Sequence, residues 1–306
     1  MREKKKILIV GGTGFIGYHL AKKALKKNWS ITSISTRKPK SIRKLKKVKY
    51  IICDIANKRF LKKYFKQHFH YVVNLGGYVD HSHRQKTFRS HYLGCVNLTD
   101  ILLKSPPITF VQMGSSGEYG RSKSPHRENN SKCRPTSVYG NSKLLSTRHL
   151  LNLFRKKNFP SVILRLYQAY GPRQDANRFL PYVIAACLKN KKFPCSEGKQ
   201  FRDFLHVDDV VDAIISSLTK KNAKGEVINI GSGKPKKIKT IIEYLAKILK
   251  GGHPQFGKIA LRKDETIKLY PSIRKAKEKI KWKPKISFER GLRETIKFYN
   301  EHYRKQ

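Results

Sequence analysis

A tyrosine and a lysine four residues apart could together move a proton. Tyr139 and Lys143 stand in the segment YGNSK, and on a helix this spacing puts both side chains on one face. Tyrosine ordinarily has a pKa near ~10, and a neighbouring ammonium favours the phenolate, which brings that pKa towards working pH. Tyr139 could then exchange a proton with an alcohol or a carbonyl as hydride moves, while Lys143 hydrogen-bonds a nicotinamide ribose. The alternative is a pair of surface neighbours on a helix.

A serine upstream could complete this chemistry. Ser115 lies in the segment GSSGEYG, at the end of a short β-rich run, Thr109–Met113. A hydroxyl at the end of a strand can hydrogen-bond the reacting oxygen and polarise it. The alternative for Ser115 is a serine that caps a turn.

A glycine loop near the start of the chain predicts a dinucleotide site. The segment GGTGFIG follows the apolar run Ile7–Val10 and opens a stretch with helical spacing. Glycine allows a tight turn and close approach of the backbone to a pyrophosphate, and the helix N-terminus offers free N–H groups to the phosphates. The predicted cofactor contacts in this loop are Gly11, Thr13, Gly14, Phe15, Ile16 and Gly17.

The residues after the second predicted strand bear on the choice of cofactor. The segment Ser33–Lys38 contains no acidic residue of the kind that holds the adenosine ribose of NAD. Thr36 and Arg37 could instead accept a 2′-phosphate, which favours NADP(H) and leaves NAD(H) as the alternative. Asp54, after the third predicted strand, could accept from the adenine amine or cap a helix.

The elements that must position these residues alternate along the chain. Short apolar runs, typical of buried strands, alternate with stretches of helical spacing, which predicts βαβ units around a parallel sheet. The expected strands are Ile7–Val10, Ile31–Ser35, Lys49–Ile52, Tyr71–Leu75, Thr109–Met113, Val162–Leu166 and Val227–Ile230. The expected helices include Arg59–Gln67, Thr87–Lys104 and Thr136–Lys156.

This order predicts an α/β chain with a Rossmann-type, doubly wound parallel sheet and a smaller C-terminal substrate lobe. We expect a dinucleotide-binding domain over 1–166, with a returning strand near 225–231, and mainly a substrate-binding lobe over 167–306. Ligands of open α/β sheets sit at the carboxyl ends of the strands, so the active site should lie between the two parts.

The charge of the chain raises the question of a polyanionic partner. Its 306 residues hold 68 Lys plus Arg and 20 Asp plus Glu, a net charge of +48, which attracts polyanions. The lysines are spread along the whole chain, the dense runs are short, and no nucleic-acid-binding motif accompanies them. We therefore expect solvated lysine-rich surfaces and no specific nucleic-acid partner.

The remaining composition predicts a protein of a reducing compartment. Five cysteines, an odd number without a C-x-x-C pair, argue against disulfides and against a zinc site, and we expect no metal. No run approaches the ~20 apolar residues that span a bilayer. We expect a cytoplasmic protein without a membrane partner.

Taken together, these segments resemble the extended short-chain dehydrogenase/reductases, in the NAD-dependent epimerase/dehydratase family that acts on nucleotide sugars. The resemblance covers nearly the whole chain. Besides GGTGFIG, SSGEYG and YGNSK, it is carried by CDI from Cys53, NLGG from Asn74, RLYQAYGPRQ from Arg165, NRFLP from Asn177 and FRDFLHVDD from Phe201.

The resemblance implies roles for particular residues. It implies Ser115, Tyr139 and Lys143 as the catalytic triad. At the cofactor it implies the loop glycines, Asp54, Ile55, Leu75, Gly76, Gly77, Tyr139, Lys143, Leu166 and Tyr167, and at the substrate Ser115, Ser116, Gln168, Asn177 and Arg202. It also implies a homodimer that pairs the helix of Tyr139 with the helix before it.

Departures from the family pattern narrow the reaction. The dehydratases of this group carry Asp-Glu directly after the serine or threonine, where this chain has Ser116 and Gly117, so dehydration is not expected. His91 and Ser272 replace a usual asparagine and aspartate. Gln168 replaces another asparagine, which suggests a reshaped sugar pocket.

Three functions remain open from the sequence. The favoured one is reduction of a nucleotide-linked 4-keto-(6-deoxy)sugar with NADPH, in which Tyr139 is the general acid/base. The first alternative is a nucleotide-sugar 4-epimerase that retains bound NAD. The second is a non-catalytic Rossmann protein that associates with RNA or has a regulatory role.

Overall fold

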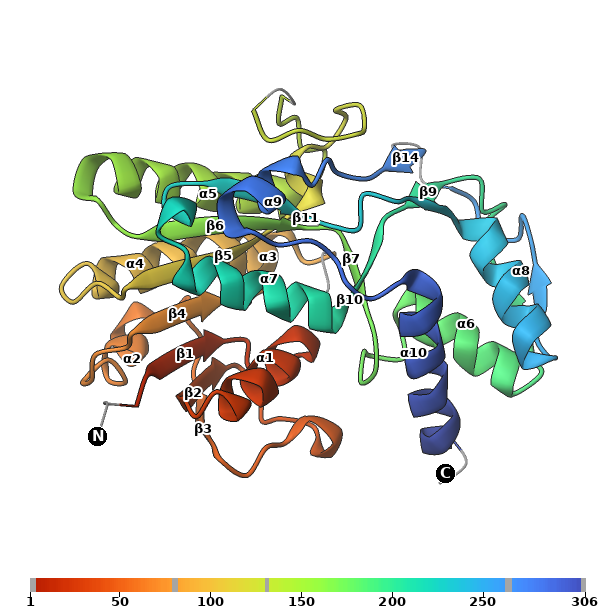
Figure 1. The fold of residues 1–306 in the computed structure, drawn as a ribbon, viewed down its shortest axis with the longest axis horizontal. Helices are drawn as coiled ribbons and strands as arrows, with labels where there is room; N and C mark the ends of the chain where they lie inside the picture. Colours follow the sequence, from red (N-terminus) through yellow and green to blue (C-terminus); the bar gives the residue numbers. More distant parts are fainter. Residues whose placement is uncertain (1–3, 79–81, 130–131, 262–265, 304–306) are drawn as a thin grey trace.

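The computed structural model describes residues 4–78, 82–129, 132–261 and 266–303. Its largest sheet has seven parallel strands in the order β11-β6-β5-β4-β1-β2-β3, and it confirms the expected α/β fold class with a Rossmann-like sheet (Figure 1). The strands are β1 (Lys6–Val10), β2 (Ser30–Ser35), β3 (Val48–Ile52), β4 (Tyr71–Asn74), β5 (Thr109–Ser115), β6 (Ser161–Leu166) and β11 (Val227–Ile230).

Alternate side chains of the first strand enter two separate cores. Ile7 and Ile9 belong to one buried cluster and Leu8 and Val10 to another, because successive side chains of a strand point to opposite faces. A sheet buried on both faces needs helices on both, which explains why this strand is a continuous apolar run.

Helices cover the two faces of this sheet (Figure 1). On one face pack α1 (Phe15–Lys26), α7 (Val207–Thr219) and α9 (Arg274–Ile280), which supply residues to the first cluster. On the other pack α2 (Lys58–Lys62), α4 (Gly94–Leu102) and α5 (Val138–Lys157). The returning strand β11 pairs with β6, so a segment late in the chain completes the edge of the sheet.

Two expected helices differ from the structure. The helix expected over Arg59–Gln67 is the short α2, which ends at Lys62. The helix expected over Thr87–Lys104 is divided into α3 (Arg84–Phe88), a π-helical segment η2 (Arg89–Leu93) and α4. The spacing of apolar residues does not register the wider turn of a π segment, and such segments are frequent at functional sites.

The C-terminal part forms smaller sheets beside the main one. They pair β7 (Gln168–Tyr170) with β10 (Phe204–His206), β9 (Phe201–Arg202) with β12 (Lys236–Lys237) and β14 (Lys268–Leu269), and β8 (Lys192–Pro194) with β13 (His253–Gln255). A third buried cluster lies among α6 (Phe179–Leu188), α8 (Ile238–Leu249) and α10 (Phe288–Tyr303), which stand to the right in Figure 1.

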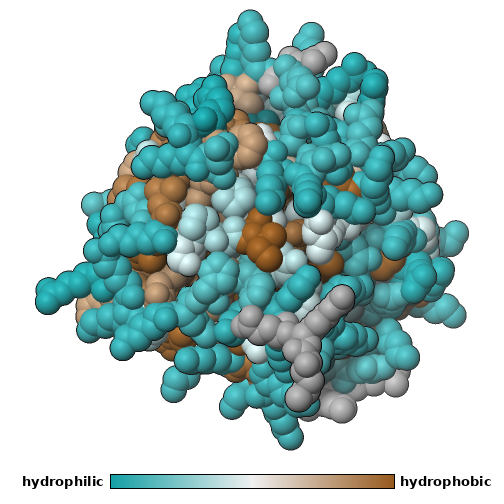
Figure 2. All heavy atoms as spheres, turned by 60° about the vertical axis from the view of Figure 1, so that its left-hand side comes forward, coloured by the Kyte–Doolittle hydropathy of each residue, from teal (hydrophilic) through white to brown (hydrophobic). Residues whose placement is uncertain are grey.

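The cysteines and the surface side chains bear on the expectations drawn from the composition. All five cysteines are free in the structure, and Cys53, Cys95, Cys187 and Cys195 are buried. Figure 2 shows hydrophilic side chains spread over one face of the molecule rather than gathered in a single strip. Among the described residues, none of the helices has the length and apolar character to cross a membrane.

Candidate active site

The glycine loop has the geometry that a pyrophosphate cradle requires. Gly11 has a φ of +78°, in the region that favours glycine. A Cβ at Gly17 would overlap the carbonyl oxygen of Gly11 and lie 2.6 Å from Cα of Gly12. Gly14 is the N-cap of α1, and no side chain caps that end of the helix. The backbone N–H groups in the first turn of α1 therefore remain available to phosphate oxygens. The loop therefore fits the dinucleotide that the sequence predicts.

Other predicted cofactor residues surround this loop. Thr13, Phe15 and Ile16 are partly exposed at the start of α1, while Thr36 and Arg37 are exposed just after β2. The backbone N–H of Thr13 donates to the Oγ of Ser35 at 3.3 Å, which ties the loop to the end of β2. The structure thus brings these residues to one edge of the sheet.

Asp54 lies on the same edge and makes a local turn. Its Oδ1 accepts from the N–H of Ala56 at 2.9 Å, and its side chain is exposed. The cap of α2 is Asn57, which accepts from Phe60, so the capping alternative for Asp54 is wrong. The neighbouring Ile55 is buried.

The segment after β4 packs against His91. Leu75 and Gly76 are partly buried and Gly77 is exposed. A Cβ at Gly77 would overlap the His91 ring, and the Nε2 of His91 lies 3.2 Å from the carbonyl oxygen of Tyr78. The buried His91, which replaces the usual asparagine, thus shapes the backbone on the side where the resemblance implies the cofactor ribose.

Ser115, Tyr139 and Lys143 come together at the carboxyl end of β5. Ser115 is the last residue of that strand and is hydrogen-bonded to Tyr139, near the start of α5. One turn further along α5, the buried Lys143 lies with its Nζ 5.9 Å from the centroid of the Tyr139 ring and donates to the carbonyl oxygen of Met113 at 2.7 Å. The ring of His91 meets that of Tyr139 edge to face at 5.0 Å.

Burial dominates the electrostatics of this group. It raises the pKa of Tyr139, while the hydrogen bond from Ser115 and the charge of Arg178 act in the opposite direction. The expected lowering of this pKa by Lys143 is thus not what the structure shows, because burial of the phenol outweighs the favourable interactions. Burial also lowers the pKa of Lys143 to about 8, which brings the lysine rather than the tyrosine close to working pH.

A buried ion pair lies directly behind Ser115, and the sequence did not predict it. The fully buried carboxylate of Glu118 accepts from the backbone N–H of Ser115 at 2.9 Å, from Oγ1 of Thr147 at 2.8 Å and from Nε of Arg165 at 2.8 Å. Charged residues are rarely fully buried unless they are paired; Glu118 lies just after β5, in the segment SSGEYG, and its partner Arg165 is 47 positions further along the chain.

The predicted residues after β6 have different surroundings. Leu166 is half-buried at the end of β6 and Gln168 is exposed at the start of β7. The hydroxyl of Tyr167 is 2.8 Å from Nδ1 of the buried His126, so this hydroxyl is engaged inside the protein rather than directed to a ligand.

The predicted diphosphate residues lie in the C-terminal part. Asn177 is exposed just before α6. Arg202 is buried, and its Nη1 donates to carbonyl oxygens of Phe201 and Thr266 at 2.7 and 2.8 Å. Burial lowers the pKa of Arg202 to about 10, so an anionic ligand beside this guanidinium would stabilise its charge.

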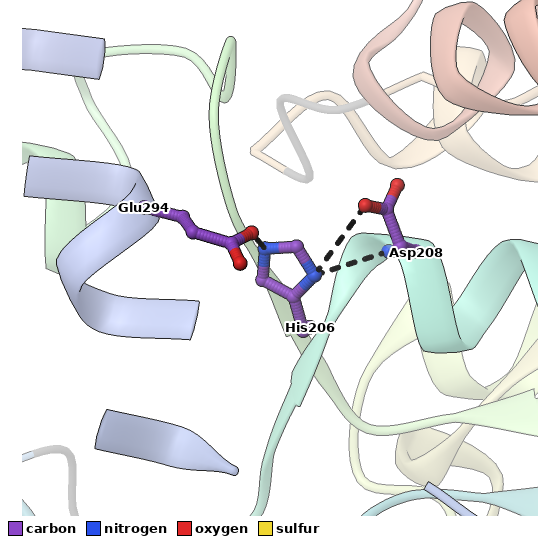
Figure 3. A group of neighbouring side chains, drawn as sticks. All are labelled: His206, Asp208 and Glu294. Carbon is purple, nitrogen blue, oxygen red and sulfur yellow. Dashed lines mark hydrogen bonds and ion pairs between the residues drawn. The ribbon is translucent and has the colours of Figure 1, made fainter. Parts of the chain in front are cut away.

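One group of side chains among the described residues is close enough to hold a metal ion: His206, Asp208 and Glu294. Figure 3 shows the imidazole between the two carboxylates. Nδ1 faces Asp208 at 4.0 Å and Nε2 faces Glu294 at 3.7 Å. Because a metal binds one ring nitrogen, carboxylates on opposite nitrogens form a link between α7 and α10 rather than a convergent set of ligands.

Comparison with known proteins identifies the family. The model of the "NAD dependent epimerase/dehydratase family" matches residues 7–231, most of the chain. The chain belongs to this family. It is therefore an enzyme of a group that acts on nucleotide sugars, and the resemblance of its motifs is confirmed.

Individual relatives carry several reactions. The chain is 28% identical to a UDP-N-acetyl-alpha-D-glucosaminuronate decarboxylase of Bacillus cytotoxicus, over 97% of this chain and 98% of that protein. It is similar to the structure of UDP-glucose 4-epimerase with UDP-glucose from Thermotoga maritima, with 25% identity, a TM-score of 0.91 and coverage of 97% and 99%. It is also similar to UDP-glucuronic acid 4-epimerase of Bacillus cereus in complex with UDP-glucuronic acid and NAD, with 27% identity, a TM-score of 0.85 and coverage of 97% and 100%.

Proposed function

We propose that this enzyme is an NAD-dependent 4-epimerase of a UDP-linked sugar. The observation that carries the proposal is the Ser115–Tyr139–Lys143 group at the end of β5, in a site where positions 116 and 117 hold serine and glycine. Elimination of water from a sugar needs an acid and a base beside the reacting carbon. A site with one tyrosine to exchange protons suits oxidation and re-reduction of an alcohol.

Residues of this chain would carry out and assist the proton transfer. Tyr139 takes the proton of the sugar hydroxyl and later returns it, and Ser115 hydrogen-bonds the same oxygen as it becomes a carbonyl. Lys143, whose Nζ lies 5.9 Å from the centroid of the Tyr139 ring, would hydrogen-bond the nicotinamide ribose. NAD, when bound, would supply the hydride acceptor for oxidation of the sugar hydroxyl.

The substrate and cofactor assignments rest on the relatives and on the placement of side chains. Arg202 and Asn177 would hold the diphosphate, Ser116 and Gln168 the sugar, and residues from 167 onward would form mainly the substrate-binding lobe. NAD is proposed because NAD is present in the Bacillus cereus complex. NADP(H), favoured by Thr36 and Arg37 in the sequence, stays the alternative. We also propose a homodimer that pairs α5 with the α3–η2–α4 stretch.

The second candidate is reduction of a nucleotide-linked 4-keto sugar. The same three residues could serve it, and the lack of an acid after β2 favours it, since net reduction suits NADPH. The two functions differ in redox balance. An epimerase isomerises its sugar without net change in NAD, whereas a reductase consumes one NADPH for each ketone. Turnover of a UDP-sugar panel, with cofactor absorbance followed in parallel, separates them.

A further inference from the structure

We propose that Glu118 is a positioning residue of this active site: its buried carboxylate holds Ser115 in place and sets the balance of charge around Tyr139 and Lys143. The inference rests on the proposed function for the identity of the reaction. Its geometry does not, because every contact lies within the chain.

The first step is the fixed orientation of the carboxylate. Glu118 follows β5 in a short 3-10 turn, η3 (Ser116–Glu118), and its side chain folds back to accept from the N–H of Ser115. Its second oxygen accepts from Thr147 of α5 and from Arg165 of β6. One buried group therefore ties together the strand end that carries Ser115 and the helix that carries Tyr139 and Lys143.

The second step is what this orientation does to the Ser115 hydroxyl. The Oγ of Ser115 accepts from the N–H of Gly117 at 3.1 Å, and together with the bond to Glu118 this makes a reciprocal cap. With one lone pair engaged by Gly117, the hydroxyl hydrogen is available towards Tyr139 or a bound sugar oxygen. If the Glu118 carboxylate moved, the backbone N–H of Ser115 would lose its hydrogen bond, and the Ser115 hydroxyl would no longer be held in this orientation.

The third step is electrostatic. The negative charge of Glu118 raises the pKa of Tyr139 and also that of Lys143, partly offsetting burial of the lysine. Since the charge acts on both groups in the same direction, its removal should move both titrations to lower pH. A side chain that only filled space would leave them where they are.

Other charged and titratable groups lie around Glu118, Tyr139 and Lys143. Arg165 of β6 pairs with Glu118 and stacks over the ring of Tyr119, with its guanidinium carbon 4.5 Å from the ring centroid. Besides burial, the charge of Glu118 also raises the pKa of Cys133. In the same way Cys95 raises the pKa of Lys143, and Arg178 lowers the pKa of Tyr139. All of these groups remain in the variants chosen below.

The test is a spectroscopic titration that needs no substrate. The near-ultraviolet difference between the protein and its Tyr139→Phe variant isolates ionisation of Tyr139, and the same difference is recorded in a Glu118→Gln background. The glutamine keeps the reach of the side chain and removes the charge. We expect the Tyr139 midpoint to shift to lower pH. An unchanged or higher midpoint would overturn the proposal.

Two further variants separate charge from position. Thr147→Val removes one hydrogen bond to the carboxylate and keeps its charge, so the Tyr139 midpoint should stay at the wild-type value; a shift as large as that of Glu118→Gln would refute the electrostatic role. Glu118→Asp keeps the charge and withdraws the oxygens from Ser115. It should lower kcat of the epimerase reaction roughly tenfold or more at unchanged KM and unchanged midpoint.

If Glu118→Gln does not fold because Arg165 is left without its partner, the Glu118→Asp variant still tests the positioning role of Glu118. Wild-type kcat in Glu118→Asp would overturn the positioning role. If the wild-type protein turns over no UDP-sugar, the proposed function fails, and the Tyr139 titration still decides whether Glu118 sets the charge balance.

Discussion

The ammonium of Lys143 hydrogen-bonds the carbonyl oxygen of Met113 at 2.7 Å, which ties α5 to the end of β5 two residues before Ser115. The lysine is buried, and this bond holds its charge near the ring of Tyr139. The bond explains how a lysine can be both a structural anchor of the helix and part of the proton chemistry.

The basic limb of the pH profile should report Lys143. Burial lowers the pKa of Lys143 to about 8, so the ammonium is present below that pH and is lost as pH rises through it. We expect kcat/KM to fall as pH rises through about 8. Lys143→Arg keeps its charge at all working pH values, so this limb should be absent although kcat is reduced. A wild-type profile that stays flat well beyond this pH would refute the assignment.

Loss of the Tyr139 hydroxyl should abolish most turnover. Tyr139→Phe keeps the ring against His91 and removes the group that exchanges the proton, so kcat should fall by about 10²–10⁴-fold. NAD affinity, measured by calorimetry, should change little. Tyr182→Phe, in an exposed tyrosine of α6, is the matched control and should retain activity. Comparable turnover in both variants would remove Tyr139 from the mechanism.

Arg37 should decide how well the enzyme accepts a 2′-phosphate. The exposed side chain follows β2, at the edge where the adenosine ribose would lie. We expect Arg37→Ala to weaken NADP binding roughly tenfold, the loss of one charge-assisted contact of about 1.5 kcal/mol, and to leave NAD binding unchanged. Exposed Lys22 of α1, changed to alanine, controls for general loss of charge. Equal effects on NAD and NADP would show that Arg37 does not face the 2′ position.

Acid should destabilise the fold partly through His206. Burial lowers the pKa of His206 despite the nearby carboxylates of Asp208 and Glu294. The folded pKa is therefore below the unfolded value of 6.5, so the unfolded state binds more protons and stability falls as pH drops through this value. Tm should decrease between about pH 7 and pH 5, and less steeply in His206→Phe.

His126 is also buried with a lowered pKa, so some slope should remain in that variant. If His206→Phe and the wild-type protein lose Tm equally on acidification, the pKa of His206 is not lowered by folding, and burial of the histidine between the carboxylates in Figure 3 does not contribute to acid destabilisation.

Sequence predicted the sheet well because buried parallel strands have a local signature. The strand expected over Val227–Ile230 is β11 with the same bounds, and the strand expected over Thr109–Met113 is β5, which continues to Ser115. The loop glycines and the Tyr139–Lys143 pair were visible for the same reason, since each depends on residues close together in the chain.

What the sequence did not show depends on contacts between distant residues. Glu118 and Arg165 meet only because β5 and β6 are neighbours in the sheet, and His206 meets Glu294 only when α10 returns to β10. The direction of the Tyr139 pKa was also misjudged, because the depth of burial is a property of the folded chain and outweighs a neighbouring charge.

Turnover of UDP-glucose in the presence of NAD is the measurement that tests the central claim most directly. With UDP-glucose and the other members of a UDP-sugar panel, the account predicts that at least one UDP-sugar reaches equilibrium with its 4-epimer, with no net accumulation of NADH, and that this conversion is lost in Tyr139→Phe. Stoichiometric consumption of NADPH with a UDP-linked 4-keto sugar, without interconversion of the 4-epimers of any UDP-sugar, would contradict it.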